Sequence, residues 1–157
     1  NQLSGMTTAS LPALGSAQMP TGSVLQVVSD TYSTETTTTP TSFTNTGLSA
    51  AITPTSTSSK ILVIGVTSLW CSTANYIRAG FERSISGGAD TFLGNATNGL
   101  ASTINAASEG NSITLNYLDS PSTTSITTYY YQYKCTHSAV AQKSGHMASM
   151  ILMEIAG

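Results

Sequence analysis

The pattern of apolar and polar residues along the chain predicts a protein built from β-strands. Segments rich in apolar, β-branched and aromatic residues recur between short runs of turn-forming residues such as "TPTSTSS", "SGGAD", "GNATNG", "DSPSTT" and "KSGH". The predicted strands are Ser23–Ser29, Gly47–Thr53, Lys60–Trp70, Asn75–Ser84, Thr91–Leu93, Asn111–Leu118, Ser125–Thr136 and Met147–Ile155. Eight strands over residues 22–157 indicate one all-β domain, an antiparallel β-sandwich or jelly roll.

The remaining segments are predicted to connect or flank these strands. Residues 1–21 carry scattered Leu and Met interrupted by Pro12 and Pro20, so we expect an extended amino-terminal arm. Because the chain begins with Asn rather than Met, we expect it to be part of a longer protein. The Thr-rich residues 32–46 are predicted as an edge strand or a long surface loop, since Pro40 suits an edge. "ASTINAASEG", residues 101–110, is predicted as a loop.

Two of the predicted strands are apolar on both faces. In "SKILVIGV", Leu62, Ile64 and Val66 alternate with Ile61 and Val63, and "MASMILMEI" repeats the pattern. No convincing helices are predicted that would cover a second apolar face, so we infer that a second copy of the chain covers it. The alternative is cover by loops and the arm of the same subunit. The residues assigned to the subunit interface are Ile61, Val63, Tyr131, Tyr133, Met150 and Leu152.

The composition is poor in charge and rich in hydroxyl groups, and this narrows the classes of partner. Charged residues make up 8% of the chain, and the five Lys and Arg are too few for a cationic groove that binds nucleic acid. The longest apolar run is far too short to span a bilayer. We therefore expect no nucleic-acid partner and no membrane insertion.

No pattern in the sequence predicts catalysis, a metal site or a cofactor. The acidic residues have no telling spacing; Glu82 is expected at the surface and Asp119 in a turn, its carboxylate accepting backbone N–H bonds. His137 and His146 flank one connection, and a metal site across a three-fold axis is the alternative to an ordinary surface role. Cys71 and Cys135 are expected to be buried free thiols, with a bridge between them as the alternative.

Aromatic residues give the one candidate for ligand binding. Tyr129, Tyr131 and Tyr133 share a strand face and are expected to fill the core and interface rather than to bind a ligand. An exposed aromatic pair beside polar loops is a better candidate for a glycan contact. The residues assigned to this contact are Trp70, Tyr76, Asn95 and Asn98.

Several segments resemble the carboxy-terminal domain of tailed-phage fibre proteins of the marine and cyanobacterial type. They are "MPTGSVLQVV", "TSFTNTGLSAAITPTSTSSKILVIG", "LNYLDSPSTTSITTYYYQYK" and the ending "MILMEIAG", and the resemblance covers roughly residues 19–157. It implies a non-enzymatic virion protein, a homotrimeric fibre or spike tip that contacts other virion proteins and a host-surface glycan or protein. A capsid decoration protein is the alternative, and a polysaccharide depolymerase is a third, less favoured reading.

Overall fold

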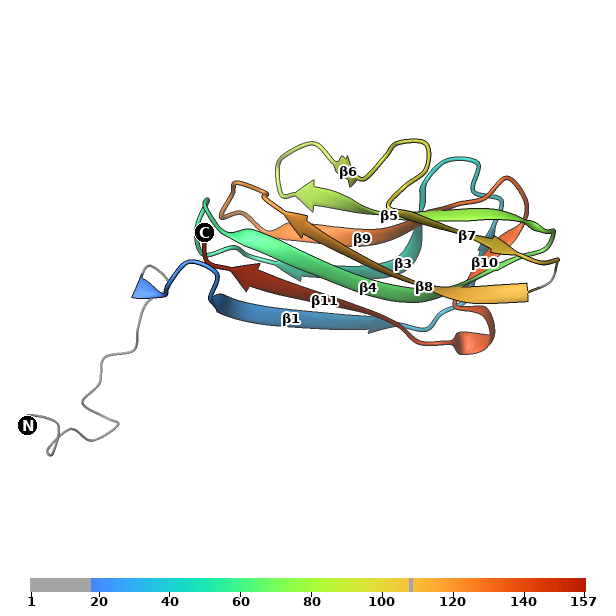
Figure 1. Cartoon of the computed structure of the whole chain (residues 1–157), viewed down its shortest axis with the longest axis horizontal. Coiled ribbons are helices and arrows are strands. Elements are labelled where there is room, and N and C mark those ends of the chain that lie inside the picture. The colour runs from blue at the N-terminus through green and yellow to red at the C-terminus, as the bar shows by residue number, and fades with distance from the viewer. Residues whose placement is uncertain (1–17, 108) are drawn as a thin grey trace, which may run out of the picture.

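The computed structural model describes residues 18–107 and 109–157, which form two antiparallel β-sheets packed face to face (Figure 1). Residues 1–17, which hold most of the predicted arm, lie outside the described part. The strands are β1 (Val24–Tyr32), β2 (Thr36–Thr38), β3 (Thr44–Ile52), β4 (Lys60–Cys71), β5 (Asn75–Ile85), β6 (Thr91–Leu93), β7 (Ala101–Asn105), β8 (Glu109–Asp119), β9 (Thr127–Lys134), β10 (Ala139–Ala141) and β11 (Ala148–Ile155). One short 3-10 turn, η3 (Lys143–Gly145), precedes β11.

The strand order is that of a jelly roll. In the first sheet, β11 lies between β1 and β4, and β8 pairs with the other edge of β4. Next to the start of β11, the short β10 pairs with the last residues of β4. The other edge of β10 pairs with β2. In the second sheet, β9 lies between β3 and β5, while β6 and β7 both pair with β5. The long strands thus alternate between two sheets, as two interlocked Greek keys require.

All eight predicted strands are present, and the structure adds three short strands, β2, β7 and β10. The Thr-rich segment contains β2, an edge strand, which is one of the two predicted alternatives. The prediction of a loop over residues 101–110 is wrong, because this segment holds β7 and the start of β8. In β7 the apolar residue points outward and the polar residue points inward: Ile104 is 60% exposed, whereas Asn105 is fully buried. The Asn105 amide reaches the core by donating hydrogen bonds to the Leu69 and Glu109 carbonyls.

The core fills the space between the sheets with alternate residues of each strand. From the first sheet it takes Ile61 and Val63 of β4 and Met150 and Leu152 of β11. From the second sheet it takes side chains including Ile77, Phe81 and the tyrosines of β9. Phe81 and Tyr131 meet edge to face, with ring centroids 5.5 Å apart. The three β9 tyrosines were predicted to fill the core and the interface, and their place in the core is confirmed.

The prediction for the subunit interface assigned the wrong faces of the strands. The six residues concerned have no exposed surface within a single subunit, so they cannot contact another copy: Ile61, Val63, Tyr131, Tyr133, Met150 and Leu152. Both faces of β4 and β11 are apolar, as predicted, but these residues point between the two sheets. Leu62, Ile64 and Val66 are instead the residues of β4 that point away from the core.

Candidate functional site

The outer face of the first sheet carries a row of apolar side chains across four neighbouring strands. Val27 of β1 lies opposite Met153 of β11, Met153 lies opposite Leu62 of β4, and Leu62 lies opposite Leu118 of β8. The two ends of the row, Val27 and Leu118, are 56% and 52% exposed. Such a row is a different surface from isolated exposed hydrophobic residues, which are common on monomeric proteins.

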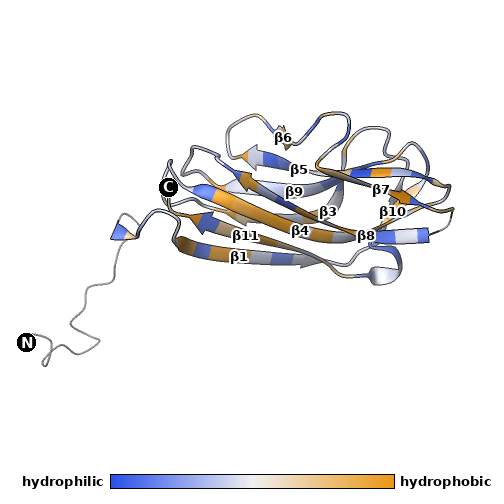
Figure 2. Ribbon diagram, in the orientation of Figure 1, coloured by the Kyte–Doolittle hydropathy of each residue, from blue (hydrophilic) through white to orange (hydrophobic). Residues whose placement is uncertain are grey.

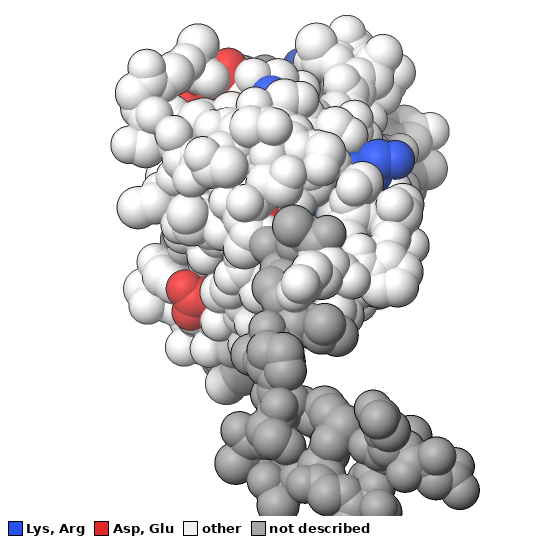
Figure 3. Space-filling view, turned by 90° about the vertical axis from the view of Figure 1, so that its left-hand side faces the viewer, with Lys and Arg blue, Asp and Glu red and all other residues white. Residues whose placement is uncertain are grey.

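The apolar character is confined to one half of this face. The neighbouring row has Ile151 and Ile64 at its centre, but Ser29 and Asn116 at its ends. Farther along the strands the outward residues become hydroxyl-bearing. Figure 2 shows this gradient, with the hydrophobic colour concentrated in the halves of β1, β4 and β8 that lie toward the carboxyl terminus of the chain. Viewed from that end, the molecule shows few charged atoms (Figure 3).

A hollow of about 320 Å³ lies at the opposite end of the same face, where β4 meets β8 and the η3 turn. Trp70 of β4 lies between two neighbours, with Val140 of β10 opposite it on one side and Gly110 of β8 on the other. Because Gly110 has no side chain, the β8 side of the indole is left without cover. The lining residues are Ser68, Trp70, Gly110, Ser112, Lys143, Ser144 and His146.

The hollow combines a cation, an aromatic ring and several hydroxyl groups. The Lys143 Nζ lies 3.7 Å from the centroid of the Trp70 ring, a cation–π contact. The indole Nε1 is buried and has no hydrogen-bond partner. The imidazole Nδ1 of His146 contacts the Lys143 carbonyl, which holds the ring against the turn. The lining contains no carboxylate.

The four residues predicted to contact a glycan are separated by the fold. Trp70 lies on the outer face of the first sheet, whereas Tyr76 lies on the outer face of the second, where it is 48% exposed. Asn98 lies near Tyr76, because its Oδ1 accepts a hydrogen bond from Arg78, whose guanidinium lies 5.6 Å from the Tyr76 ring centroid. Asn95 has a structural role, since its Oδ1 accepts the backbone N–H groups of residues 97 and 98.

Sequence reasoning missed the partners that complete the hollow around Trp70. Lys143 and Gly110 are separated from Trp70 by tens of residues, and neither stands in a recognisable motif. Gly110 was indistinguishable from an ordinary turn glycine. Lys143 was noted only as part of a turn. Their proximity to Trp70 follows from the pairing of β4 with both β8 and β10, which the sequence alone does not specify.

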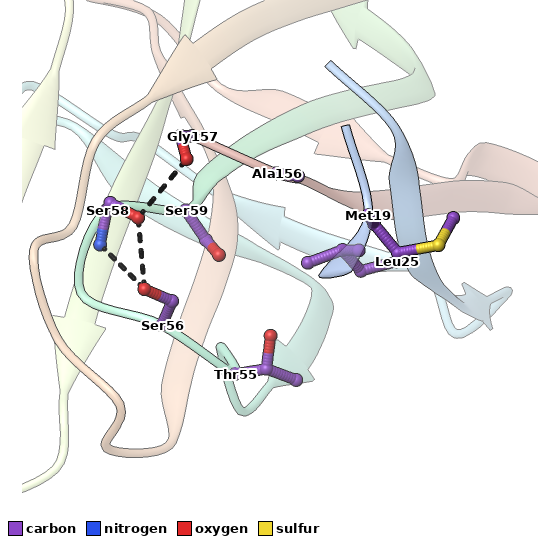
Figure 4. A pocket seen from close by; sticks show the side chains of 8 residues that line it. All are labelled: Met19, Leu25, Thr55, Ser56, Ser58, Ser59, Ala156 and Gly157. Atoms are coloured by element: carbon purple, nitrogen blue, oxygen red, sulfur yellow. Dashed lines mark hydrogen bonds between the residues drawn. The ribbon is translucent and has the colours of Figure 1, made fainter. Parts of the chain in front are cut away.

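A second hollow, of about 230 Å³, lies where the described chain begins and ends. Figure 4 shows that Ser56, Ser58 and Gly157 line it, with Ser58 hydrogen-bonded both to the Ser56 hydroxyl and to the Gly157 carbonyl. Its polar groups therefore serve the corner between the carboxyl terminus and the β3–β4 loop. Next to it, Ala156 and residues 22–23 exchange backbone hydrogen bonds that hold the two ends of the domain together.

Arg83 and Asp119 form a structural ion pair at the edge of the core. Arg83 Nη1 lies 2.9 Å from Asp119 Oδ1, and Asp119 is 5% exposed. The Tyr129 hydroxyl donates to Asp119 Oδ2 at 2.7 Å, and burial raises the pKa of that phenol well above its usual range. The expectation that Asp119 accepts backbone N–H bonds in a turn is therefore wrong: it ends β8 and binds side chains.

Metal-binding clusters and membrane-spanning helices are absent from the described residues. Within residues 18–107 and 109–157, no three His, Cys, Asp or Glu side chains gather in a way that would hold a metal ion. The same residues include no helix with the length and apolar character needed to cross a membrane.

Comparison with known proteins gives similarity of structure alone. No protein family and no curated protein matches the chain. A structure of the infectious bursal disease virus Gx strain is similar over 93% of this chain, at 11% identity and a TM-score of 0.44. A structure of the Gt strain is similar over 94%, at 13% identity and a TM-score of 0.37. The chain spans 41% and 43% of the lengths of those two chains.

Proposed function

We propose that this chain is a structural, non-enzymatic domain of a phage particle, the trimeric tip of a fibre or spike that attaches the virion to the host surface. Three copies associate through the apolar row on the outer face of the first sheet. The opposite end of the domain then faces the host glycan or protein. Two things support the proposal: the apolar row on the outer face of the first sheet, and the resemblance of the sequence to fibre domains.

The apolar row is the observation that carries the proposal. Complete burial of one aliphatic side chain is worth about 1.5–3 kcal/mol, so covering the exposed halves of Val27 and Leu118 contributes roughly 1 kcal/mol each. The partly exposed Leu62 and Met153 between them add to this. A second copy of the same charge-poor face is a complementary cover, because the row itself holds no charged residue and the row on its other side contributes at its end Lys60, whose long side chain can keep its ammonium in water.

The position of the first described residues and of the carboxyl terminus fits a domain that is held at one end. The carboxyl terminus and the first described residues lie together at one end of the sandwich, next to the apolar row (Figure 1). The hollow around Trp70 lies at the other end. A domain held to a shaft at the terminal end would therefore present that hollow and its neighbouring loops outward.

The oligomeric state is the direct test of the assembly. In analytical ultracentrifugation at micromolar concentration, the chain should sediment with three times the 16.2 kDa mass of one copy. Leu118→Asp should shift it to the monomer, because a charge at the exposed end of the row would be buried without a partner. Ser112→Asp, on the same face of the same strand but away from the row, is the matched control. A monomer at every concentration would contradict the proposal.

The role in attachment needs a separate measurement. Purified protein should bind host cells, and a label against it should decorate the fibre ends of intact particles. Saturating decoration of capsids without binding to cells would instead identify a head decoration protein. Release of reducing sugar from the host polysaccharide would show a depolymerase and overturn the non-enzymatic assignment.

A further inference from the structure

We infer that the hollow around Trp70 is a binding site for an acidic saccharide, a sugar chain that carries carboxylate groups. The inference deepens the proposed attachment role and rests on it for its biological meaning. The site is built by residues of β4, β8 and the η3 turn, and each contributes a different part of the recognition.

The indole of Trp70 provides the flat apolar surface of the site. Aromatic rings stack against the C–H faces of sugar rings, and Trp offers the largest such surface together with an N–H donor. Gly110 lies directly opposite Trp70 in the β4–β8 pairing. A Cβ added to Gly110 would meet the Leu69 carbonyl oxygen and the Trp70 Cβ and Cα at contact distances of 3.4–3.7 Å. The backbone therefore tolerates a side chain here, and glycine keeps the space beside the indole free.

Hydroxyl groups surround this surface. Ser68 of β4 lies opposite Ser112 of β8. This pair is two residues away from the Trp70–Gly110 pair and lies on the same face of the sheet. Ser144 lines the hollow from the turn. A hydroxyl both donates and accepts, which matches the mixed donor and acceptor groups of a sugar. The Trp70 Nε1 is buried without a partner, so the hydroxyl groups of the lining, not the indole N–H, are the groups that a ligand reaches from solvent.

The charge of the hollow points to an anionic ligand. The Lys143 ammonium lies over the indole and forms no ion pair within the described residues, where the salt bridge recorded is Arg83–Asp119. Glu35 is not among the lining residues, but its Oε2 accepts the Ser144 backbone N–H at 2.8 Å, so one carboxylate contacts the turn next to Lys143. A carboxylate on the ligand would meet the Lys143 cation in a hollow whose own lining residues include no acid.

Fluorescence gives a direct measurement, because Trp70 is the one tryptophan of the chain. The probes are oligogalacturonate, hyaluronan oligosaccharide and sialyllactose, each compared with its neutral counterpart. At least one acidic probe should change the intensity or wavelength of Trp70 emission in a saturable way, whereas its neutral counterpart should bind roughly tenfold more weakly or worse. Binding of no acidic probe, or equal binding of a neutral one, would overturn the inference.

Two variants localise the binding. Lys143→Met keeps the aliphatic stem and removes the charge, so the affinity for the acidic probe should fall by roughly tenfold. Lys134→Met is the matched control, because its ammonium lies over the Phe43 ring, 5.7 Å from the centroid, on the other sheet. Gly110→Val should abolish binding by filling the hollow while leaving the free energy of unfolding nearly unchanged. Equal losses in Lys134→Met and Lys143→Met would place the site elsewhere.

These outcomes are separable from the proposed function. Trimer formation and binding to host cells without any response of Trp70 would leave the attachment role intact and remove this site. A saturable Trp70 response in a monomeric protein that does not bind cells would leave the site and remove the attachment role.

Discussion

Cys71 and Cys135 bring their Sγ atoms to 3.1 Å across the interior of the sandwich. Cys71 ends β4 in the first sheet, and Cys135 follows β9 in the second. Both side chains are fully buried. Burial, together with the contact to Cys71, raises the pKa of Cys135 to about 11. At neutral pH the pair therefore consists of thiols that face each other and link the two sheets by contact.

A disulfide should form between these residues when the chain refolds in the presence of oxidised glutathione. Two thiol hydrogens would pass to the glutathione, giving its reduced form and one protein S–S bond. A bridge closing a loop of this length stabilises a fold by roughly 4 kcal/mol in the chain-entropy description. Urea unfolding of the oxidised and reduced proteins measures the difference. Both cysteines remaining open to alkylation in denaturant after oxidative refolding would contradict it.

The raised pKa of Cys135 makes a kinetic prediction about the same pair. Since the thiolate is the attacking species, oxidation of the folded reduced protein at pH 7 should be much slower than oxidation during refolding. Mass spectrometry of samples quenched with acid follows both reactions. Equal rates would show that the thiols are not shielded by the fold.

The Arg83–Asp119 pair should contribute more to the free energy of unfolding than the surface contacts of Arg78. Arg83→Met leaves the buried Asp119 carboxylate without its cation, which costs about 3–5 kcal/mol. Arg78→Met, which removes a partly exposed Arg from the outer face of the second sheet, should cost less than 1 kcal/mol. Chemical denaturation of the two variants provides the comparison. Similar losses in both would show that burial of the pair has no special effect.

Strand positions were predictable because each long strand carries a strong local signal. Turn residues delimit β4, β5 and β8, and the predicted bounds of these strands differ from the observed ones by two residues or fewer. The short β7 and β10 lacked such a signal. Their positions depend on pairing with β5 and β4, respectively, and the buried polar Asn105 further obscured the alternation of β7.

The choice between the two faces of a doubly apolar strand was not predictable in the same way. Alternation shows which residues share a face but not which face points inward. In β11 the acidic Glu154 shares a face with Met150 and Leu152, although an acidic residue is typical of an outer face. In the structure this face is internal. Glu154 is fully buried, and hydrogen bonds from another strand and a loop satisfy it.

Glu154 should make the stability of the domain depend on pH in the acid range. Burial by itself would raise the pKa of its carboxyl, but hydrogen bonds from Gln26 and from the backbone and hydroxyl of Thr55 outweigh this and lower it. A depressed pKa in the folded state contributes stability above the unfolded pKa, about 4.3, and this contribution is lost as the pH falls through the lower folded value.

Replacement of this carboxylate tests the linkage. Glu154→Gln should lower the free energy of unfolding by about 1–3 kcal/mol at pH 7, because some of the donors would lose their acceptor. The difference from the unmodified protein should shrink below about pH 4. Glu109→Gln, at an exposed position of β8, should show neither effect. A difference that stays constant between pH 7 and pH 3 would contradict the assignment.

Gly47 should be far less tolerant of a side chain than Gly22, although both have positive φ angles, +95° and +89°. Gly47 interrupts the regular register of β3, and a Cβ there would overlap the ring of Tyr32, which β1 places against it. At Gly22 an added Cβ would meet nothing within 4 Å.

Alanine at either position loses about 1 kcal/mol of stability, because its side chain disfavours the left-handed backbone. Gly47→Ala should lose a further 1–3 kcal/mol or so, since the Tyr32 ring must move out of a packed site. Urea denaturation of the two variants isolates this packing contribution, because the backbone cost is common to both; equal losses would show that Tyr32 moves aside freely and that β1 and β3 are not packed tightly at this point.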